Sequence, residues 1–204
     1  MSFESTVALA LTGASGMCYG VGLLERLLAA NARVYLLYSQ VAQMVARQEL
    51  DLTFPSRARE CEEFLATRYQ IRSGQLRVFA REDWQAPVAS GSNPPDAFVI
   101  CPCTMGTLAA VAMGLGETLI QRAADVMLKE KRKLILVPRE TPFSIPHLEN
   151  MLKLARAGAV ILPANPGFYH HPNSVQELVD FVVARILDHL NLPHRLMPRW
   201  GEPE

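Results

Sequence analysis

The stretch VALALTGASG, residues 7–16, decides how the rest of this sequence is interpreted. It is a short apolar run that ends in a turn rich in glycine and hydroxyl groups. Such a turn is typical of nucleotide-binding proteins, in which a buried strand is followed by a helix whose first N–H groups face an anion. The glycine spacing differs from the Gly-x-Gly-x-x-Gly pattern of dinucleotide-binding strands. The stretch therefore predicts an α/β fold with a ligand at the end of the first strand, and it leaves the ligand open.

Length and composition indicate one domain. The chain has 204 residues, of which 50% are hydrophobic, and this is enough for one substantial core. We expect a single domain over residues 1–204 that includes a C-terminal tail, residues 191–204. Lys plus Arg and Asp plus Glu are equal at 20 each, so no excess of basic residues favours a nucleic-acid partner or an anionic membrane.

Two segments bear on the location of the protein in the cell. The N-terminus, Met1–Glu4, carries an acid and no basic residue, so it is not typical of a signal peptide. The uncharged run Ala97–Gly116 is long enough for a membrane span, but Pro102 and Gly106 interrupt it, which favours a strand followed by a helix. We therefore expect a cytoplasmic protein without a membrane partner.

Short apolar runs alternate with segments of helical periodicity along the chain. The expected strands are Thr6–Thr12, Arg33–Ser39, Gln75–Ala80, Ala97–Cys101, Lys133–Val137 and Ala159–Leu162. The expected helices are Tyr19–Ala30, Gln40–Glu49, Ala58–Tyr69, Thr104–Met113, Thr118–Lys131, Pro146–Ala157 and Ser174–Leu190. This alternation predicts a parallel sheet covered by helices on both faces. Ligands of such folds bind beyond the carboxyl ends of the strands, so the residues at those ends are the candidates for a site.

The cysteines show no spacing typical of a metal site. In Cys101-Pro102-Cys103 we expect Pro102 to end the strand and the two thiols to point to opposite faces. Cys18 and Cys61 stand alone, and no His-Glu-x-x-His pattern is present. Reduced thiols in a core are the favoured interpretation, and no metal site is expected.

The first two strand ends carry serine. Ser15 lies in the glycine turn and could contact a ligand or only cap the following helix. Ser39 could cap its helix in the same way. Glu49 ends that helix, where an acid opposes the helix dipole, so its position costs stability unless another group uses it.

The ends of the fourth and fifth strands are more polar. Thr104 and Thr107, with Gly106 between them, place two hydroxyls at a helix start, which suits a phosphate group without any lysine. Arg139 and Glu140 directly follow a buried strand and are flanked by prolines. A solvent-exposed loop would also explain this pair, but a functional role is favoured.

Other residues allow a functional and a structural interpretation. Arg122, Asp125 and Lys129 share one helix face, as residues of an exposed salt-bridged stripe also do. Trp84 and Trp200 lie in irregular segments, where they could form aromatic walls around a ligand or only anchor their loops.

The segment Thr104–Met113 contains no charged residue around its circumference. The sheet can cover only one face of a helix, so we expect the other face to contact neighbouring chains in an assembly larger than a dimer.

Five stretches together resemble the UbiX-like flavin prenyltransferases. They are LTGASG (11–16), CPCTMGTLAAVAMG (101–114), LIQRAADVMLKEKRKLILVPRETPFS (119–144), HLENMLKLARAGAVILPANPGFYHHP (147–172) and LVDFVVARILDHL (178–190). They occur in the order of the family and are spread over nearly the whole length of the chain. The combination of RAADVMLKE, LVPRETPF and HLENM is highly specific.

The resemblance implies both a fold and a reaction. The fold is a three-layer α/β/α Rossmann-like fold with a parallel six-stranded sheet of order 3-2-1-4-5-6. The reaction joins a dimethylallyl group, taken from dimethylallyl phosphate, to N5 and C6 of reduced FMN without a metal. The product, prenylated FMN, serves a UbiD-type decarboxylase, as in ubiquinone biosynthesis. The family forms homo-oligomers, typically dodecamers.

The resemblance also implies roles for individual residues. FMN would be bound by Gly13, Ala14, Ser15, Ser39, Thr104, Met105, Gly106, Thr107 and Arg139. The prenyl phosphate would be held by Arg122, Lys129, Glu140, Tyr169 and Arg185. Glu140 would donate a proton to the leaving phosphate, and Glu49 with Ser15 would accept the proton lost from the flavin ring. Trp84 and Trp200 would shield an allylic cation.

Two alternatives share this fold. An FMN-dependent decarboxylase of the phosphopantothenoylcysteine type is the first, but Pro163-Ala164-Asn165-Pro166 does not fit its substrate-binding motif. A flavin carrier is the second, and it would have no use for the cations expected to bind a second phosphate.

Overall fold

The carboxyl ends of six parallel strands form one edge of this protein. The computed structural model describes residues 3–197, 199 and 201. Within them one sheet has the order β3-β2-β1-β4-β5-β6, and all its pairs are parallel. Its strands are β1 (Thr6–Leu11), β2 (Arg33–Tyr38), β3 (Leu76–Val78), β4 (Ala97–Cys103), β5 (Lys133–Pro138) and β6 (Val160–Ile161). The fold class and the strand order are confirmed.

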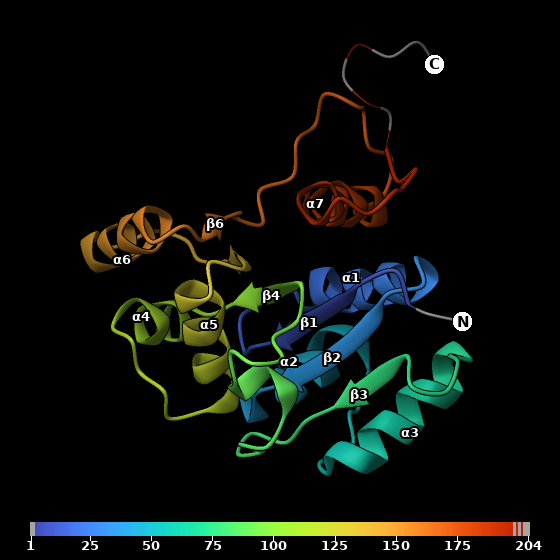
Figure 1. Cartoon of the computed structure of the whole chain (residues 1–204). Helices are drawn as coiled ribbons and strands as arrows, with labels where there is room; N and C mark the ends of the chain where they lie inside the picture. The colour runs from blue at the N-terminus through green and yellow to red at the C-terminus, as the bar shows by residue number, and fades with distance from the viewer. Residues whose placement is uncertain (1–2, 198, 200, 202–204) are drawn as a thin grey trace.

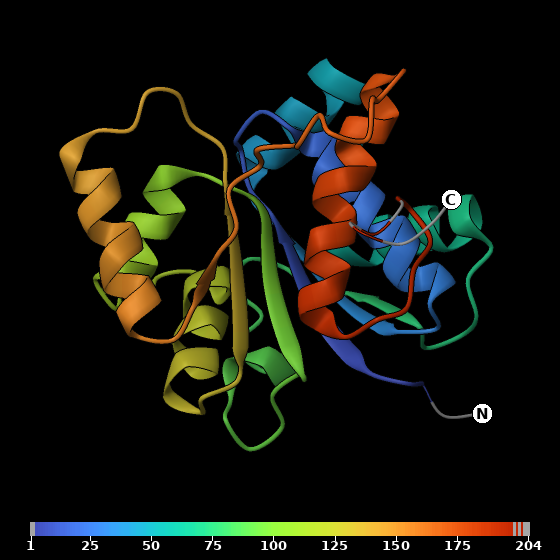
Figure 2. The same ribbon diagram turned by 90° about the horizontal axis from the view of Figure 1, so that it is seen from above.

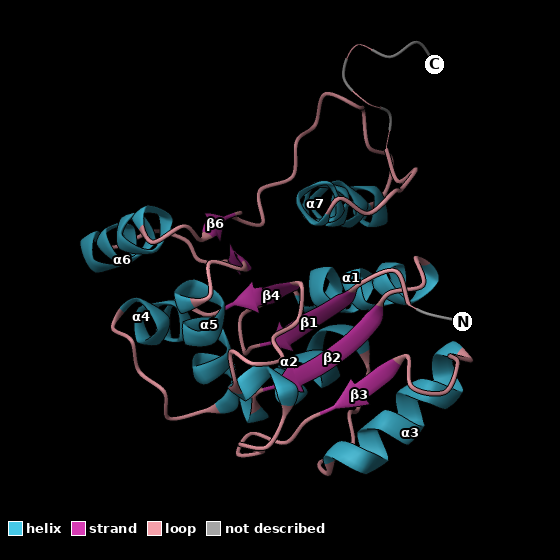
Figure 3. Ribbon diagram, viewed as in Figure 1, coloured by secondary structure: helices cyan, strands magenta, loops and turns pink. Residues whose placement is uncertain are grey.

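Helices cover both faces of this sheet, as Figures 1 and 2 show. One core lies under α1 (Met17–Ala29), α2 (Gln40–Leu50), α3 (Ala58–Tyr69) and α7 (Val175–Leu190). The other core lies under η1 (Pro87–Ala89), α4 (Met105–Ala112), α5 (Leu119–Lys129) and α6 (Ile145–Arg156). Along the chain one or two helical segments separate successive strands, and Figure 3 distinguishes the helices from the strands of the sheet that they cover.

The middle of the sheet is buried on both faces, which explains the continuous apolar runs of its strands. In β4, Val99 and Cys101 face the first core, whereas Phe98, Ile100 and Cys103 face the second. Residues two apart in a regular strand share a face. The expected separation of Cys101 and Cys103 is confirmed, and it results from a register irregularity between Ile100 and Cys103.

The expectation that Pro102 ends the fourth strand is wrong. The strand β4 continues to Cys103, which pairs with Pro138 of β5. Proline lacks an N–H group but keeps its carbonyl, and the carbonyl of Pro102 accepts hydrogen bonds from the backbone N–H (3.2 Å) and the hydroxyl (2.7 Å) of Thr12. The end of β4 is therefore joined to the end of β1.

The uncharged helix α4 is covered by another helix of the same chain. Its sheet side is buried, and α6 packs against its other side. α6 itself leaves apolar side chains open: Ile145, Leu148 and Leu152 are 72%, 52% and 51% exposed, and of its residues only Leu154 is fully buried. Among the described residues, no helix is both long and apolar enough to cross a membrane.

Candidate functional site

The turn after β1 meets the end of β5. Arg139 donates a hydrogen bond from Nε to the carbonyl oxygen of Ser15 at 3.1 Å. The next residue, Glu140, accepts a hydrogen bond from the backbone N–H of Thr141 at 3.2 Å. Ser15 is exposed and does not cap α1, because the cap position is occupied by Gly16 with φ at 99°. The serine hydroxyl and the Glu140 carboxylate thus both stand at the carboxyl edge of the sheet, as expected.

The glycine at the start of this turn is required by close packing. A Cβ atom on Gly13 would lie 2.3 Å from Cγ1 of Val41, in the first turn of α2. The backbone between β1 and α1 therefore runs directly beside the start of α2. Within the turn, Ala14 is buried whereas Ser15 is exposed, so Ser15 is the residue of the turn that a ligand can reach.

Glu49 caps the helix that follows the turn. Its Oε2 accepts hydrogen bonds from the backbone N–H groups of Gly16 (3.0 Å) and Met17 (2.8 Å). A carboxylate at a helix N-terminus is stabilised by the helix dipole and by N–H groups that lack partners inside the helix. This contact offsets the cost of an acid at the end of α2, and it brings Glu49 next to Ser15. The sequence indicated that Glu49 is unfavourable at the end of its own helix, but it did not indicate that its carboxylate contacts the start of α1.

A cavity of about 180 Å³ lies between the ends of β2 and β3 and the starts of three helices. Ser39, Thr107 and Thr118 contribute hydroxyl groups to its lining. Ser39 and Thr118 are N-caps, and their side chains accept hydrogen bonds from Ala42 N–H and Gln121 N–H. Converging helix N-termini with hydroxyl groups favour a phosphate.

Thr104 connects this cavity to the centre of the sheet. Its hydroxyl accepts from Thr107 N–H at 3.1 Å and lies 2.9 Å from the Thr107 hydroxyl. Its own N–H donates to the hydroxyl of Thr12 at 2.8 Å. Gly106 is exposed with open space around its α-carbon, whereas the side chain of Met105 is buried in the core. Of this segment, the backbone and the two threonine hydroxyls are therefore the groups that can face a ligand.

Two expected phosphate-binding cations lie on α5. Arg122 donates from Nε to the carbonyl of Ala89 at 3.0 Å and forms an ion pair with Asp125 at 2.9 Å. Lys129 forms an ion pair with Glu130. The stripe on α5 is thus salt-bridged, and it also holds the loop around η1.

Two other expected phosphate-binding residues lie on the opposite side of the sheet. Arg185 projects from α7 and forms an ion pair with Asp188 at 2.7 Å. The ring of Tyr169 packs edge-on against Phe181 of α7, with the ring centres 5.8 Å apart. The helices α5 and α7 cover opposite faces of the sheet (Figure 2). One chain therefore presents the expected phosphate-binding residues as two separate groups, Arg122 and Lys129 on α5 and Tyr169 and Arg185 at α7.

The two tryptophans have different outcomes. Trp84 lies in the loop after β3, at the carboxyl edge, and is 49% exposed, so it is not a core residue. Its role as an aromatic wall stays a prediction. Trp200 lies outside the described residues.

All four cysteines are free; Cys61, Cys101 and Cys103 are buried in the cores, and Cys18 is half-buried. Burial raises the pKa of Cys103 to about 12 and that of Cys101 well above its ordinary value. Both are therefore protonated thiols at neutral pH, which suits packing. Among the residues described here, no cluster of three or more potential metal ligands is present.

Several lining residues were not identified from the sequence. Arg81, Gln121 and Phe79 line the cavity, and the buried Thr12 joins β1 to β4. Arg81 follows β3, so the rule that ligands bind at strand ends could have found it. Thr12 gave no such signal, because only the pairing of β1 with β4 places its hydroxyl between two backbone groups.

Comparisons with known proteins identify the family to which this chain is similar. The model of the Flavoprotein family matches residues 1–187. The chain is 55% identical over 202 residues to flavin prenyltransferase UbiX of Pseudomonas aeruginosa, covering 99% of this chain and 97% of that protein. It is also similar to the structure of AnUbiX (PadA1) in complex with FMN and dimethylallyl pyrophosphate, with a TM-score of 0.86 and 38% identity over 98% of this chain and 99% of that one. A dodecameric FMN-dependent UbiX-like decarboxylase from Escherichia coli O157:H7 has a TM-score of 0.84 and 38% identity, covering 97% and 100% of the two chains.

Proposed function

The chain belongs to the Flavoprotein family and is a UbiX-type flavin prenyltransferase, and from this premise we propose how its own residues carry out the transfer. The activity joins a dimethylallyl group to reduced FMN, which is a substrate here. One observation supports our placement of the site. The cavity lined by Ser39, Thr107 and Thr118 lies at the same edge of the sheet as the Ser15–Arg139 contact. The decarboxylase and carrier alternatives are not favoured.

We place the FMN phosphate in this cavity. Its volume of about 180 Å³ is below the roughly 300–1,000 Å³ of pockets that enclose a drug-sized ligand, so it suits one part of FMN. Ser39 and Thr107 offer hydroxyl groups and Arg81 a cation. The flavin ring would then lie over the backbone of Gly13–Ser15, with Arg139 beside it.

The donor phosphate requires residues from both sides of the sheet. Arg122 and Lys129 on α5 would bind it from one side, and Tyr169 and Arg185 from the other. Because one chain keeps these two groups apart, we propose that a second copy of the chain completes the site.

The acids then divide the proton transfers. Glu140 directly follows Arg139 and would protonate the departing phosphate. The cations of the donor site would stabilise the negative charge of that phosphate. Glu49, which lies beside the Ser15 turn, would accept the proton released by the flavin ring. Trp84 and Trp200 would face the allylic carbon, where aromatic faces stabilise positive charge and exclude water.

Further parts of the proposal concern the setting of the enzyme. We propose that the product passes to a UbiD-type decarboxylase and that the protein is cytoplasmic, which its four free cysteines support. We also propose one domain over the whole chain, supported by one sheet and a family match over residues 1–187.

The reaction itself is the test. Incubated anaerobically with reduced FMN and dimethylallyl phosphate, the enzyme is expected to yield a flavin heavier by one prenyl group. Mass spectrometry of the extracted flavin measures this. Unchanged FMN with intact donor after long incubation would contradict the proposed activity.

We expect a homo-oligomer larger than a dimer, and we propose a dodecamer, as the E. coli neighbour is described. The exposed apolar side chains of α6 require cover, and another chain can supply it. Leu148→Glu is expected to lower the assembly mass in light scattering, because it places a charge in that contact.

A matched control for this prediction lies on a charged helix face. Glu63→Lys on α3, where Glu63 pairs with Arg59 at 3.1 Å, should leave the mass unchanged. A monodisperse monomer for the unmodified protein at micromolar concentration would contradict both the assembly and the completion of the donor site by a second copy.

A further inference from the structure

Each cation of the proposed donor site has a carboxylate partner on its own helix or directly after it. The pairs are Arg122–Asp125, Lys129–Glu130 and Arg185–Asp188. Pairs of this kind on exposed helix faces contribute little to stability. Each of the three expected phosphate-binding cations is nevertheless paired in this way, which raises the question of what the carboxylates do for phosphate binding.

The two pairs on α5 are held against one loop. Arg122 donates to the carbonyl of Ala89 at 3.0 Å, at the end of η1. A Cβ atom on Gly91 would lie 2.0 Å from Oε1 of Glu130 and 2.8 Å from Nζ of Lys129. The backbone of this one loop thus contacts both ion pairs.

The α5 part of the proposed donor site, which consists of the pairs Arg122–Asp125 and Lys129–Glu130, has no net charge. Hydrogen bonding to Lys129 lowers the pKa of Glu130, so this carboxylate is ionised at neutral pH. Asp125 forms an ion pair with Arg122 at 2.9 Å. The side chains of all four residues are partly exposed, so an incoming phosphate would meet the carboxylates as well as the cations.

A site without net charge treats phosphate donors differently from a cationic site. A phosphate monoester carries a charge of about −2 at neutral pH, and a diphosphate ester carries about one more negative charge. Unopposed cations would attract the diphosphate more strongly in proportion to its charge. Paired carboxylates remove that advantage and leave the choice to the shape and hydrogen bonds of the site.

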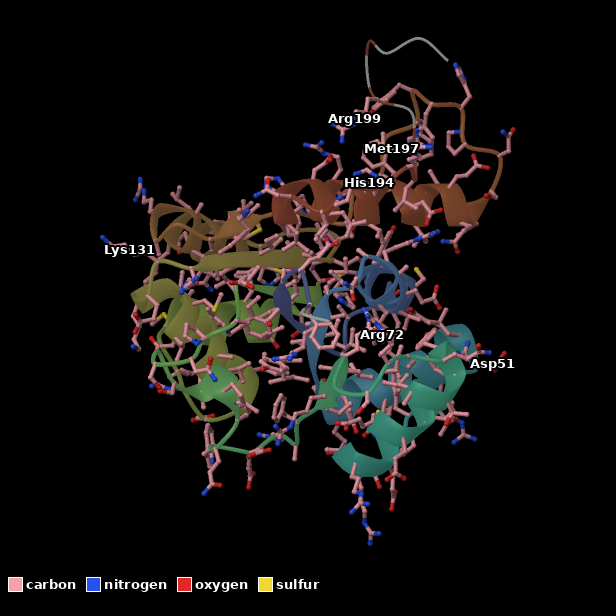
Figure 4. All side chains as sticks on the ribbon, turned by 45° about the vertical axis from the view of Figure 1, so that its right-hand side comes forward. Asp51, Arg72, Lys131, His194, Met197 and Arg199 are labelled. Carbon is pink, nitrogen blue, oxygen red and sulfur yellow. The ribbon has the colours of Figure 1, made fainter. Side chains whose placement is uncertain are left out.

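We propose that Asp125 and Glu130 are specificity-determining residues, which favour dimethylallyl monophosphate over the diphosphate by neutralising Arg122 and Lys129. The inference rests on the proposed function and on the placement of the donor phosphate beside α5. On α7, Arg185 pairs with Asp188, but this carboxylate is shared with further basic residues, so the proposal concerns the two pairs on α5 alone. Asp188 also faces His194 at 3.1 Å and Arg199 at 3.8 Å, and Figure 4 shows these two residues beside α7.

The decisive variant is Glu130→Gln, which keeps the shape of the side chain and removes its charge. The ratio of kcat/KM for the diphosphate to that for the monophosphate is expected to rise about three- to tenfold, because one repulsive charge is lost near the extra phosphate. Asp125→Asn should shift the ratio in the same direction. The shift should shrink as salt concentration rises, whereas a change of shape would persist.

Two controls separate charge from structure. Glu130→Asp keeps the charge and should keep the ratio of the unmodified enzyme. Glu63→Gln removes a carboxylate from the ion pair with Arg59 on α3 and should leave the ratio unchanged. Thermal unfolding of each variant shows whether it is folded.

A binding measurement makes the inference independent of turnover. Calorimetric titration of the FMN-loaded enzyme with inorganic phosphate and with pyrophosphate should show that Glu130→Gln raises the pyrophosphate-to-phosphate affinity ratio. An unchanged ratio, or no binding of either ion, would overturn the inference. If no donor is turned over by the unmodified enzyme, the proposed function fails, and the affinity ratio alone decides the role of Glu130.

Discussion

The Glu140→Gln variant is expected to lose about a hundredfold or more of the rate of prenyl transfer, the range typical of a lost general acid. Glu140 follows Arg139, whose contact with Ser15 holds the end of β5 against the flavin turn. Its carboxylate accepts a hydrogen bond from Thr141 N–H. Glutamine can keep that bond through its amide oxygen but cannot protonate a phosphate oxygen. The loss should therefore be in kcat, with KM for the donor changed little.

Single-turnover release of phosphate measures this step directly. Glu117→Gln is a suitable control, because Glu117 is an exposed carboxylate in the loop before α5. The control should release phosphate at the rate of the unmodified enzyme. Release at that same rate by Glu140→Gln would show that another group, or water, protonates the phosphate.

The Glu49→Gln variant is expected to form the first bond to the flavin and then to stall. The proposed role of Glu49 is to accept the proton lost from the ring, which a neutral amide cannot do. We expect a singly alkylated flavin to accumulate and the final product to form about a hundredfold more slowly. Absorption spectra during anaerobic turnover, with mass spectrometry of quenched samples, distinguish the two species.

A structural effect accompanies this chemical one. The Glu49 carboxylate accepts hydrogen bonds from Gly16 and Met17 N–H. Glutamine keeps an acceptor oxygen but loses the negative charge at the start of α1, which costs roughly 0.3–1 kcal/mol. Ser174→Ala, which removes the cap of α7, is a control of similar cost. It should lower stability without accumulation of the alkylated species. If Glu49→Gln and Glu140→Gln stall at the same species, the proposed division between the two acids is wrong.

Local patterns predicted most of the fold. The apolar runs, the helical periodicity and the turn residues between them gave the strands and helices to within a few residues at their ends. Buried parallel strands and amphipathic helices depend mainly on short-range order along the chain. The rule for parallel sheets then correctly placed Ser15 and Arg139 at one edge, 124 residues apart in sequence.

The exceptions depended on contacts between distant elements. Pro102 remained inside β4 because Thr12, in a neighbouring strand, uses its carbonyl. The uncharged surface of α4 is covered by α6, and α6 itself leaves apolar side chains open. Propensities describe a residue and its near neighbours, and they contain no information about such partners.

The sequence by itself determined which chemical groups this protein has: a glycine turn, hydroxyl-capped helices, two acids and a set of cations at the expected strand ends and helix faces. Only the tertiary structure decided which of these groups meet. It placed Glu49 on the N-terminus of α1 and divided Arg122 and Lys129 from Tyr169 and Arg185. The physical reason is that periodicity sets the face on which a side chain lies, whereas its partner is set by the packing of helices onto opposite sides of one sheet.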